Sequence, residues 1–187
     1  FNDRKILDEV KLLIIAGSQG AKFFDQEVKD AVINLSKKYK LKIYQQSNNE
    51  NLETLKNFYN SKNIDHQLFN YKENIFEFIS NSNLCITRAG ASTLSELTHL
   101  NVPYLAIPYP LAKDDHQYEN ALFYKNKNCC WILKQDEINT EVLSNKLMQI
   151  IENKDDYSEK KMNMKNFSYQ NSWNKINEKI IQTINEN

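Results

Sequence analysis

Short apolar runs alternate along the chain with longer segments in which apolar residues recur every three or four positions. The apolar runs are typical of buried strands, which we predict at 11–16, 41–45, 66–70, 83–87, 102–108 and 130–133. The periodic segments are typical of amphipathic helices, which we predict at 23–39, 51–60, 75–79, 93–100, 116–126 and 140–152. This alternation predicts an α/β fold, a Rossmann-like doubly wound parallel sheet of about six strands.

The pattern divides the chain into three parts. Residues 1–10 are interpreted as a linker or interdomain segment, and 11–153 as one domain with a single core. Beyond Asn153 the chain is polar and rich in Lys and Asn, and its scattered apolar residues predict terminal helices within 154–187. The sequence leaves open whether these helices pack on this domain or on an amino-terminal domain outside the chain. Because the first residue is Phe1, we expect a piece of a longer protein.

The composition of the chain limits the kinds of ligand and partner that it can bind. The chain has 24 basic and 24 acidic residues, so no overall field attracts it to nucleic acid or anionic lipid, and an anionic ligand must be bound locally. Cys85, Cys129 and Cys130 lack the spacing of metal ligands, and we expect no metal and no cofactor. No apolar run approaches the roughly 20 residues of a membrane-spanning helix, which favours a soluble, cytoplasmic chain.

The loop after the first predicted strand contains Gly17, Ser18, Gln19 and Gly20. Small residues between a buried strand and a helix leave backbone N–H groups free, and these groups attract phosphate together with the helix dipole. The loop is not a Walker A motif, because no Lys-Ser or Lys-Thr follows its second glycine. Taken alone, it fits an ordinary tight turn nearly as well as a phosphate site.

A second run of small residues, 87–96, lies where the fourth predicted strand meets a helix. Ser92 or Thr93 can cap that helix, with Glu96 completing a capping box. That interpretation does not explain the run from Arg88 to Ala91. Alternatively, Glu96 accepts both hydroxyls of a ribose, as acidic residues do in nucleotide-binding folds.

A third polar group, 114–117, follows the fifth predicted strand. Asp114 or Asp115 can serve as the N-cap of the next helix, where the dipole favours acids. His116 and Gln117 offer hydrogen bonds to a sugar or a phosphate. His116 can also act as a general base, although no second residue is evident to orient its imidazole.

The three segments together, AGSQGA at 16–21, TRAGAST at 87–93 and DDHQ at 114–117, resemble the carboxy-terminal domain of the MurG family of GT-B glycosyltransferases. The resemblance covers the chain from about Lys11 to Ile151. Members of that family transfer N-acetylglucosamine (GlcNAc) from UDP-GlcNAc to undecaprenyl-pyrophosphoryl-MurNAc-pentapeptide (lipid I), which gives lipid II for peptidoglycan synthesis. They work as peripheral proteins at the cytoplasmic face of the bacterial inner membrane.

The resemblance implies a set of donor-binding residues. Ser18 and its loop would contact the diphosphate, Glu96 the ribose, and His116 and Gln117 the GlcNAc. The loop near Tyr71 would seat the uracil. The full implied set is Gly17, Ser18, Gln19, Gly20, Tyr71, Lys72, Ile75, Arg88, Ala91, Ser92, Thr93, Leu94, Ser95, Glu96, His116 and Gln117.

The resemblance also implies what this chain lacks. The family's amino-terminal domain binds the lipid acceptor and supplies the expected catalytic base, so we expect this chain to bind UDP-GlcNAc without completing the transfer alone. The intact enzyme would catalyse an inverting, metal-free displacement. Two alternatives remain: another UDP-sugar enzyme of GT-B architecture, such as an epimerase or a hydrolase, and a non-catalytic nucleotide-binding module.

Overall fold

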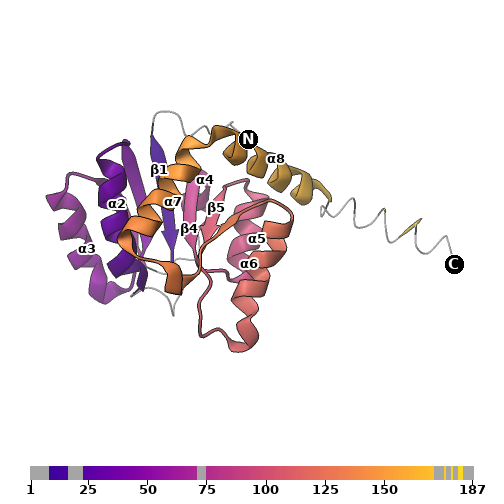
Figure 1. Cartoon of the computed structure of the whole chain (residues 1–187), viewed down its shortest axis with the longest axis horizontal. Coiled ribbons are helices and arrows are strands. Elements are labelled where there is room, and N and C mark those ends of the chain that lie inside the picture. Colours follow the sequence, from indigo (N-terminus) through magenta and orange to yellow (C-terminus); the bar gives the residue numbers. More distant parts are fainter. Residues whose placement is uncertain are drawn as a thin grey trace.

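The computed structural model of the chain describes residues 9–16, 23–70, 75–170, 175, 178 and 181–182. Its centre is a six-stranded, fully parallel sheet with the strand order β3-β2-β1-β4-β5-β6 (Figure 1). The strands are β1 (Val10–Ile15), β2 (Leu41–Gln46), β3 (Asp65–Phe69), β4 (Leu84–Thr87), β5 (Tyr104–Ala106) and β6 (Trp131–Ile132). The order reverses between β1 and β4, so the predicted doubly wound α/β fold is confirmed.

Helices cover both faces of the sheet. They are a π-helical turn η1 (Phe24–Val28), α2 (Lys29–Ser36), α3 (Asn49–Ser61), α4 (Phe76–Asn81), α5 (Ala91–His99), α6 (His116–Asn126), α7 (Thr140–Glu152) and α8 (Lys154–Gln170), with short 3₁₀ turns η2 (Lys113–Asp115) and η3 (Gln135–Glu137). The helices α2, α3 and α7 pack with one apolar cluster, and α4, α5 and α6 pack with the other.

The central strands explain why the core has two halves. Leu12 and Ile14 of β1 face the first cluster, whereas Leu13 and Ile15 face the second. All four side chains are at most 4% exposed. Successive side chains of a strand point to opposite faces, so a strand buried on both faces must be apolar throughout.

Most predicted elements differ from the observed ones by one to three residues at an end, and two of these differences lie next to the carboxyl ends of the strands. The fifth strand pairs only over Tyr104–Ala106, and prolines at 103 and 108 lie outside the paired residues because they have no N–H for a ladder. The helix predicted at 93–100 begins two residues earlier, at Ala91, and its N-cap is Gly90 with no side-chain hydrogen bond. The prediction that Ser92 or Thr93 caps this helix is therefore wrong.

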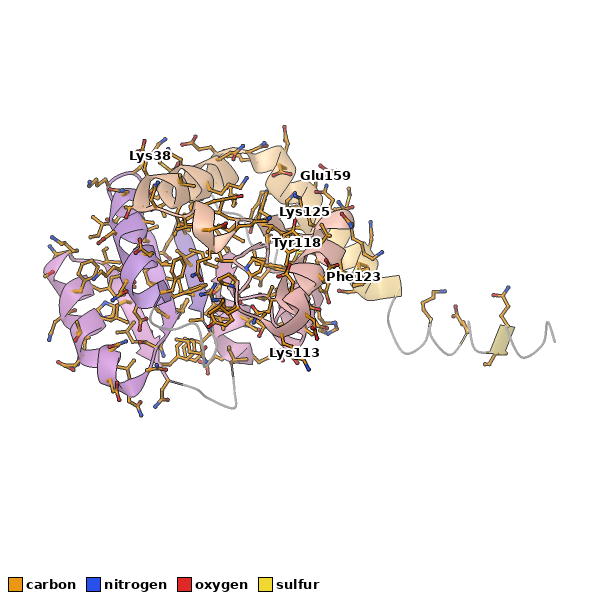
Figure 2. The ribbon with its side chains drawn as sticks, turned by 60° about the horizontal axis from the view of Figure 1, so that its bottom comes forward. Lys38, Lys113, Tyr118, Phe123, Lys125 and Glu159 are labelled. Carbon is orange, nitrogen blue, oxygen red and sulfur yellow. The ribbon has the colours of Figure 1, made fainter. Side chains whose placement is uncertain are left out.

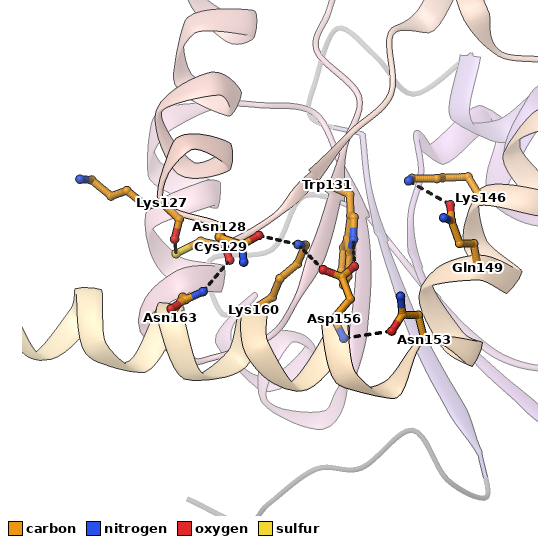
Figure 3. A network of polar contacts seen from close by, with 10 residues as sticks. All are labelled: Lys127, Asn128, Cys129, Trp131, Lys146, Gln149, Asn153, Asp156, Lys160 and Asn163. Atoms are coloured by element: carbon orange, nitrogen blue, oxygen red, sulfur yellow. Dashed lines mark hydrogen bonds and ion pairs between the residues drawn. The ribbon is translucent and has the colours of Figure 1, made fainter.

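The last described helix, α8, packs at the amino-end edge of the sheet, where the strands begin. Its Lys160 is only 4% exposed. The Lys160 amine donates to Asn128 Oδ1 and Asp156 Oδ1, both at 2.8 Å, and lies 4.8 Å from the centre of the Trp131 ring (Figure 3). Trp131 Nε1 donates to Asp156 Oδ2 at 2.7 Å. We call these four residues the α8 clamp.

The helix α8 also crosses from one core half to the other. Its Tyr157 packs in the first cluster and donates to the Asn83 carbonyl, and its Met164 packs in the second cluster. The described part of the terminal segment thus packs on this domain. Packing of later residues on an amino-terminal domain stays a prediction. Within the described ranges, no helix has the length and apolar character needed to cross a membrane.

Candidate functional site

The carboxyl ends of three neighbouring strands lie level with one another. Ile15 of β1 is in register with Thr87 of β4, which is in register with Ala106 of β5. The Arg88 N–H donates to the Ile15 carbonyl at 3.2 Å, and the Ile107 N–H donates to the Thr87 carbonyl at 2.8 Å. The segments after β4 and β5 therefore start side by side, at the edge where doubly wound folds bind ligands.

Part of the predicted site lies outside the described residues. This applies to the glycine loop, with Gly17, Ser18, Gln19 and Gly20, and to Tyr71 and Lys72. Ile75 is described: it is the N-cap of α4, half-buried, and packs against the second apolar cluster.

The start of α5 presents its backbone at this edge. Ala91 and Ser92 are exposed, Thr93 is half-buried, and the N-cap Gly90 has no side chain that could occupy their N–H groups. A Cβ built on Gly90 would meet only the Thr93 hydroxyl, at 4.0 Å. Uncapped N–H groups and the helix dipole together favour an anion.

The remaining α5 residues of the predicted site differ in exposure. The Leu94 side chain is fully buried in the core, which leaves only its backbone for a ligand. Ser95 is exposed and Glu96 is half-buried. Within the described part of the chain, the Glu96 carboxylate makes no hydrogen bond or ion pair, and glycine at the N-cap rules out the capping box. Glu96 is thus available to a ligand.

Arg88 is buried, at 6% exposure, and its guanidinium binds protein oxygens. Its Nη1 donates to the carbonyls of Ile107 and Pro108 at 3.1 and 3.2 Å, and its Nη2 donates to Gln135 Oε1 at 2.6 Å. Nε has no acceptor among the residues that the structure describes. A direct contact between Arg88 and the donor therefore stays a prediction, whereas its contacts with two strand-end carbonyls and with Gln135 are established.

Three aromatic rings surround the same guanidinium. Its Cζ lies 5.2 Å from the ring centre of Phe23, 4.9 Å from that of Phe24 and 5.4 Å from that of Tyr109. Burial lowers the pKa of Arg88 to about 10, so the side chain is still cationic at neutral pH. The charge is held by ring faces and carbonyl dipoles.

Two amide side chains of α6 fix the segment between β4 and α5. Gln117 Oε1 accepts from the Ala89 N–H at 3.2 Å and from the Tyr109 N–H at 3.0 Å. Asn120 Nδ2 donates to the Ala89 carbonyl at 3.1 Å. Sequence reasoning did not identify Asn120. The sequence contained an indication, because Asn120 lies three positions after Gln117, and residues three apart on a helix share a face.

His116 lies exposed at the start of α6, and its imidazole does have an orienting group. Nδ1 lies 2.7 Å from the Lys113 carbonyl, and since a carbonyl only accepts, Nδ1 carries the proton and Nε2 is the acceptor of the neutral ring. Asp114 and Asp115 both have φ of 53°, and Asp115 is the N-cap without a side-chain hydrogen bond. In Figure 2, Lys113 of this loop is labelled below Phe123 of α6, and Glu159 of α8 is labelled above it.

A buried carboxylate near the end of β2 was also missed. Asp25, 6% exposed, accepts hydrogen bonds from Gln45 Nε2 at 3.0 Å and from the Ser47 hydroxyl and Asn51 Nδ2, both at 2.8 Å. The Tyr59 hydroxyl donates to Gln45 Oε1 at 2.6 Å, and burial, followed by the charge of Asp25, raises the Tyr59 pKa. The polar residues at 45–51, directly after the apolar start of β2, were the available indication of a polar site there.

The fold and the site together define the class of the protein. It is a doubly wound α/β domain. Beyond the carboxyl ends of its strands lie a helix start without a side-chain cap and an arginine surrounded by aromatic rings. The sequence profile of the glycosyltransferase family 28 C-terminal domain matches residues 11–179. The chain belongs to that family. In the described part of the chain, no group of three or more His, Cys, Asp or Glu residues is placed to hold a metal ion.

Individual similar proteins agree with this family assignment. The chain is 57% identical over 183 residues to the UDP-N-acetylglucosamine--N-acetylmuramyl-(pentapeptide) pyrophosphoryl-undecaprenol N-acetylglucosamine transferase of Pelagibacter ubique (strain HTCC1062), covering 98% of this chain and 51% of the relative. The crystal structure of Acinetobacter baumannii MurG superposes with a TM-score of 0.74 at 27% identity, over 88% of this chain and 46% of that one.

The likeness to an epimerase is more distant. A UDP-GlcNAc 2-epimerase from Neisseria meningitidis, solved with UDP-GlcNAc bound, gives a TM-score of 0.56 at 15% identity, over 86% of this chain and 40% of that one. At that identity the likeness shows the shared fold alone. The chain spans about half the length of the curated relatives it matches.

Proposed function

We propose that this chain is the donor-binding domain of the glycosyltransferase that transfers GlcNAc from UDP-GlcNAc to lipid I to give lipid II. The observation that carries the proposal is the 57% identity, over 98% of the chain, to a transferase with that name. Membership in the glycosyltransferase family 28 C-terminal domain family supports the donor-binding half of the reaction.

The donor lies across the carboxyl ends of β1, β4 and β5 in this proposal. The glycine loop, with Ser18, receives the diphosphate together with the uncapped start of α5 at 91–93. Glu96, half-buried and without a protein partner among the described residues, accepts the ribose hydroxyls. Ile75 and the preceding 71–72 seat the uracil. His116 and Gln117 face the GlcNAc.

These groups stabilise the leaving group. As the bond between GlcNAc and the diphosphate breaks, negative charge develops on UDP, and helix N–H groups aimed at that charge stabilise the transition state without reorganising. The chain supplies the donor side alone. We expect the base that deprotonates the acceptor hydroxyl on an amino-terminal domain outside this chain, which covers 51% of that relative. The displacement inverts the configuration and uses no metal.

The remaining parts of the chain receive roles in the same proposal. Residues 1–10 are the interdomain segment, 11–153 the UDP-GlcNAc-binding domain, and 154–187 the terminal helices, with the part after α8 docking on the amino-terminal domain. Lipid I binds through that other domain. The intact enzyme works as a peripheral protein at the cytoplasmic face of the bacterial inner membrane.

One observation favours a second candidate, hydrolysis of a UDP-sugar. The Lys113 carbonyl fixes the His116 ring with Nε2 as an acceptor, which is the state that a general base needs. Incubating the chain alone with UDP-GlcNAc and measuring free GlcNAc separates the two candidates. Transfer chemistry predicts no release, and release that His116→Ala abolishes would establish the hydrolase.

Calorimetric titration tests the proposed function directly. UDP-GlcNAc and UDP should bind, and ATP should bind far more weakly, because only the uridine nucleotides carry the expected base. A folded sample that binds no uridine nucleotide would exclude the donor-domain role. Equal affinity for ATP and UDP would favour a general nucleotide-binding module.

A further inference from the structure

Arg88 is the residue that connects the ends of three strands. Its backbone N–H binds the Ile15 carbonyl at the end of β1, and its Nη1 binds the Ile107 and Pro108 carbonyls just beyond β5. Arg88 itself directly follows β4. No β-ladder pairs β1 with β5, since β4 lies between them. The backbone N–H thus connects β4 to β1, and the guanidinium connects the segment after β4 to the segment after β5.

The contacts require the forked shape of arginine. Nη1 donates to two carbonyls while Nη2 donates to Gln135, and Cζ lies within 5.4 Å of three ring centres. A lysine amine is a compact point charge and cannot occupy both branches of this arrangement. The ion pairs among the described residues do not include Arg88, so its partners are neutral.

We propose that Arg88 is a positioning residue for donor binding, whose guanidinium holds the segments after β4 and β5 at a fixed spacing and does not touch the donor. The inference rests on the proposed function. Ala91, the first residue of α5, is only three positions after Arg88. Any shift of the strand end thus moves the N–H groups that receive the diphosphate. Gln135, which anchors the other branch of the guanidinium, has the same role to a lesser degree.

The fold offers a matched control. Lys160 is also a buried cation over an aromatic ring, at 4.8 Å from the Trp131 centre, but it lies in the α8 clamp at the opposite edge of the sheet. Removing either cation is expected to lower the melting temperature. Only the loss of Arg88 is expected to change the affinity for the donor.

The main experiment measures the Kd of UDP-GlcNAc for the chain and for Arg88→Lys, Arg88→Met, Gln135→Leu and Lys160→Met, at a temperature where each is folded. Arg88→Lys should weaken binding about tenfold, as expected for lost hydrogen bonds from a charged group. Arg88→Met should weaken it further and Gln135→Leu less. Lys160→Met should stay within twofold of the parent. An Arg88→Lys variant that also stays within twofold overturns the inference.

A second measurement needs no ligand. The Ala89 and Tyr109 N–H groups both donate to Gln117 Oε1, so they report on the spacing of the two strand ends. Their amide hydrogen exchange should be faster in Arg88→Lys and unchanged, after correction for global stability, in Lys160→Met. If the parent binds no uridine nucleotide, the proposed function fails, and this exchange still decides whether Arg88 holds the strand ends. Unchanged exchange in Arg88→Lys overturns that role.

Salt separates positioning from a direct contact. If Arg88 bound the diphosphate itself, its contribution would weaken as KCl rises, because salt screens an ion pair that solvent can reach. The affinity ratio of parent to Arg88→Met, which lacks the charge, would then shrink. Positioning predicts a ratio that is the same at low and high salt, and a shrinking ratio would assign Arg88 to the donor.

Discussion

Two buried cations, at opposite edges of the same sheet, differ in the groups that bind them. Lys160, at the amino-end edge, has the Asp156 carboxylate at 2.8 Å. Arg88, at the carboxyl-end edge, has backbone carbonyls, an amide oxygen and aromatic rings. Both side chains are at least nine-tenths buried, and both lie against aromatic rings.

The difference indicates separate roles for the amino-end edge, where Lys160 lies, and the carboxyl-end edge, where Arg88 lies. A cation paired with a carboxylate exerts little field beyond its partner, which suits the α8 clamp as a fastener between α8 and β6. Carbonyl dipoles and rings hold a cation without cancelling its net charge. At the carboxyl-end edge these groups connect Arg88 to the segments beside the start of α5, where the proposed diphosphate lies. Stability should depend mainly on one edge and affinity on the other.

The largest expected effect comes from breaking the clamp with Asp156→Ala. The variant leaves the Lys160 amine buried without its carboxylate, and removing one partner of a buried pair costs about 3 kcal/mol at the lower end of the usual range. Urea unfolding should show this loss, with the affinity for UDP-GlcNAc unchanged. Asp155→Ala, at the exposed neighbouring position, is the control. A large loss of affinity in Asp156→Ala would contradict the division of roles.

Glu96→Ala should produce the converse result at the other edge. Loss of the ribose hydrogen bonds should weaken UDP and UDP-GlcNAc alike, by about 2 kcal/mol for bonds to a charged group. The free energy of unfolding should change little, because the carboxylate has no partner among the described residues. Calorimetry measures both ligands, with Glu141→Ala on the exposed part of α7 as the control. Unchanged affinity would leave Glu96 without a role in binding.

A smaller effect is expected for Asn120→Ala, which removes the hydrogen bond to the Ala89 carbonyl. A single neutral hydrogen bond contributes about 1 kcal/mol. Because the bond fixes the segment before α5, we expect this loss in the free energy of unfolding together with a modest loss of affinity. Asn126→Ala, at the exposed end of the same helix, serves for comparison. A change in neither quantity would mean that Gln117 alone holds the segment.

The smallest effect concerns pH and sharpens the description of the clamp. Burial raises the pKa of Asp156, but hydrogen bonds from Lys160 and Trp131 and the charge of Lys160 lower it more, so the net pKa is below its ordinary value. A depressed pKa stabilises the fold above the unfolded-state value of about 3.9, and this contribution is lost as pH falls through the folded-state pKa. Stability should thus fall less steeply with acid in Asp156→Asn. An equal slope in both proteins would show that Asp156 titrates alike folded and unfolded.

Local patterns in the sequence predicted most of the fold. The helices at 116–126 and 140–152 have the predicted bounds, because their apolar spacing and their starts depend on neighbouring residues. The start of α5 was misplaced because hydroxyl residues indicated a cap, while the structure uses Gly90.

The site was predicted less completely, because its contacts are non-local. Nothing near Arg88 in the sequence reveals that its guanidinium meets carbonyls of Ile107 and Pro108 or a side chain 47 positions away, Gln135. The partners of Asp25 come likewise from β2, from Ser47 just after it and from α3. Residue types indicated where a ligand could bind. Which side chains face it, and which hold the backbone in place, depended on the packing of distant strands.

The central pairing of β1 with β4 also bears on how the chain folds. Lys11 and Asn83, which share a hydrogen bond at the start of that pair, are 72 positions apart, whereas β1–β2 and β4–β5 join through single helical crossovers. Closing the longer loop costs more chain entropy, and this cost comes before the contacts between β1 and β4 can offset it. We expect the two halves to form first and their junction last, which pulse-labelled hydrogen exchange would reveal as late protection of the amides between β1 and β4. The three strand ends that Arg88 joins would then be assembled only in the final step of folding.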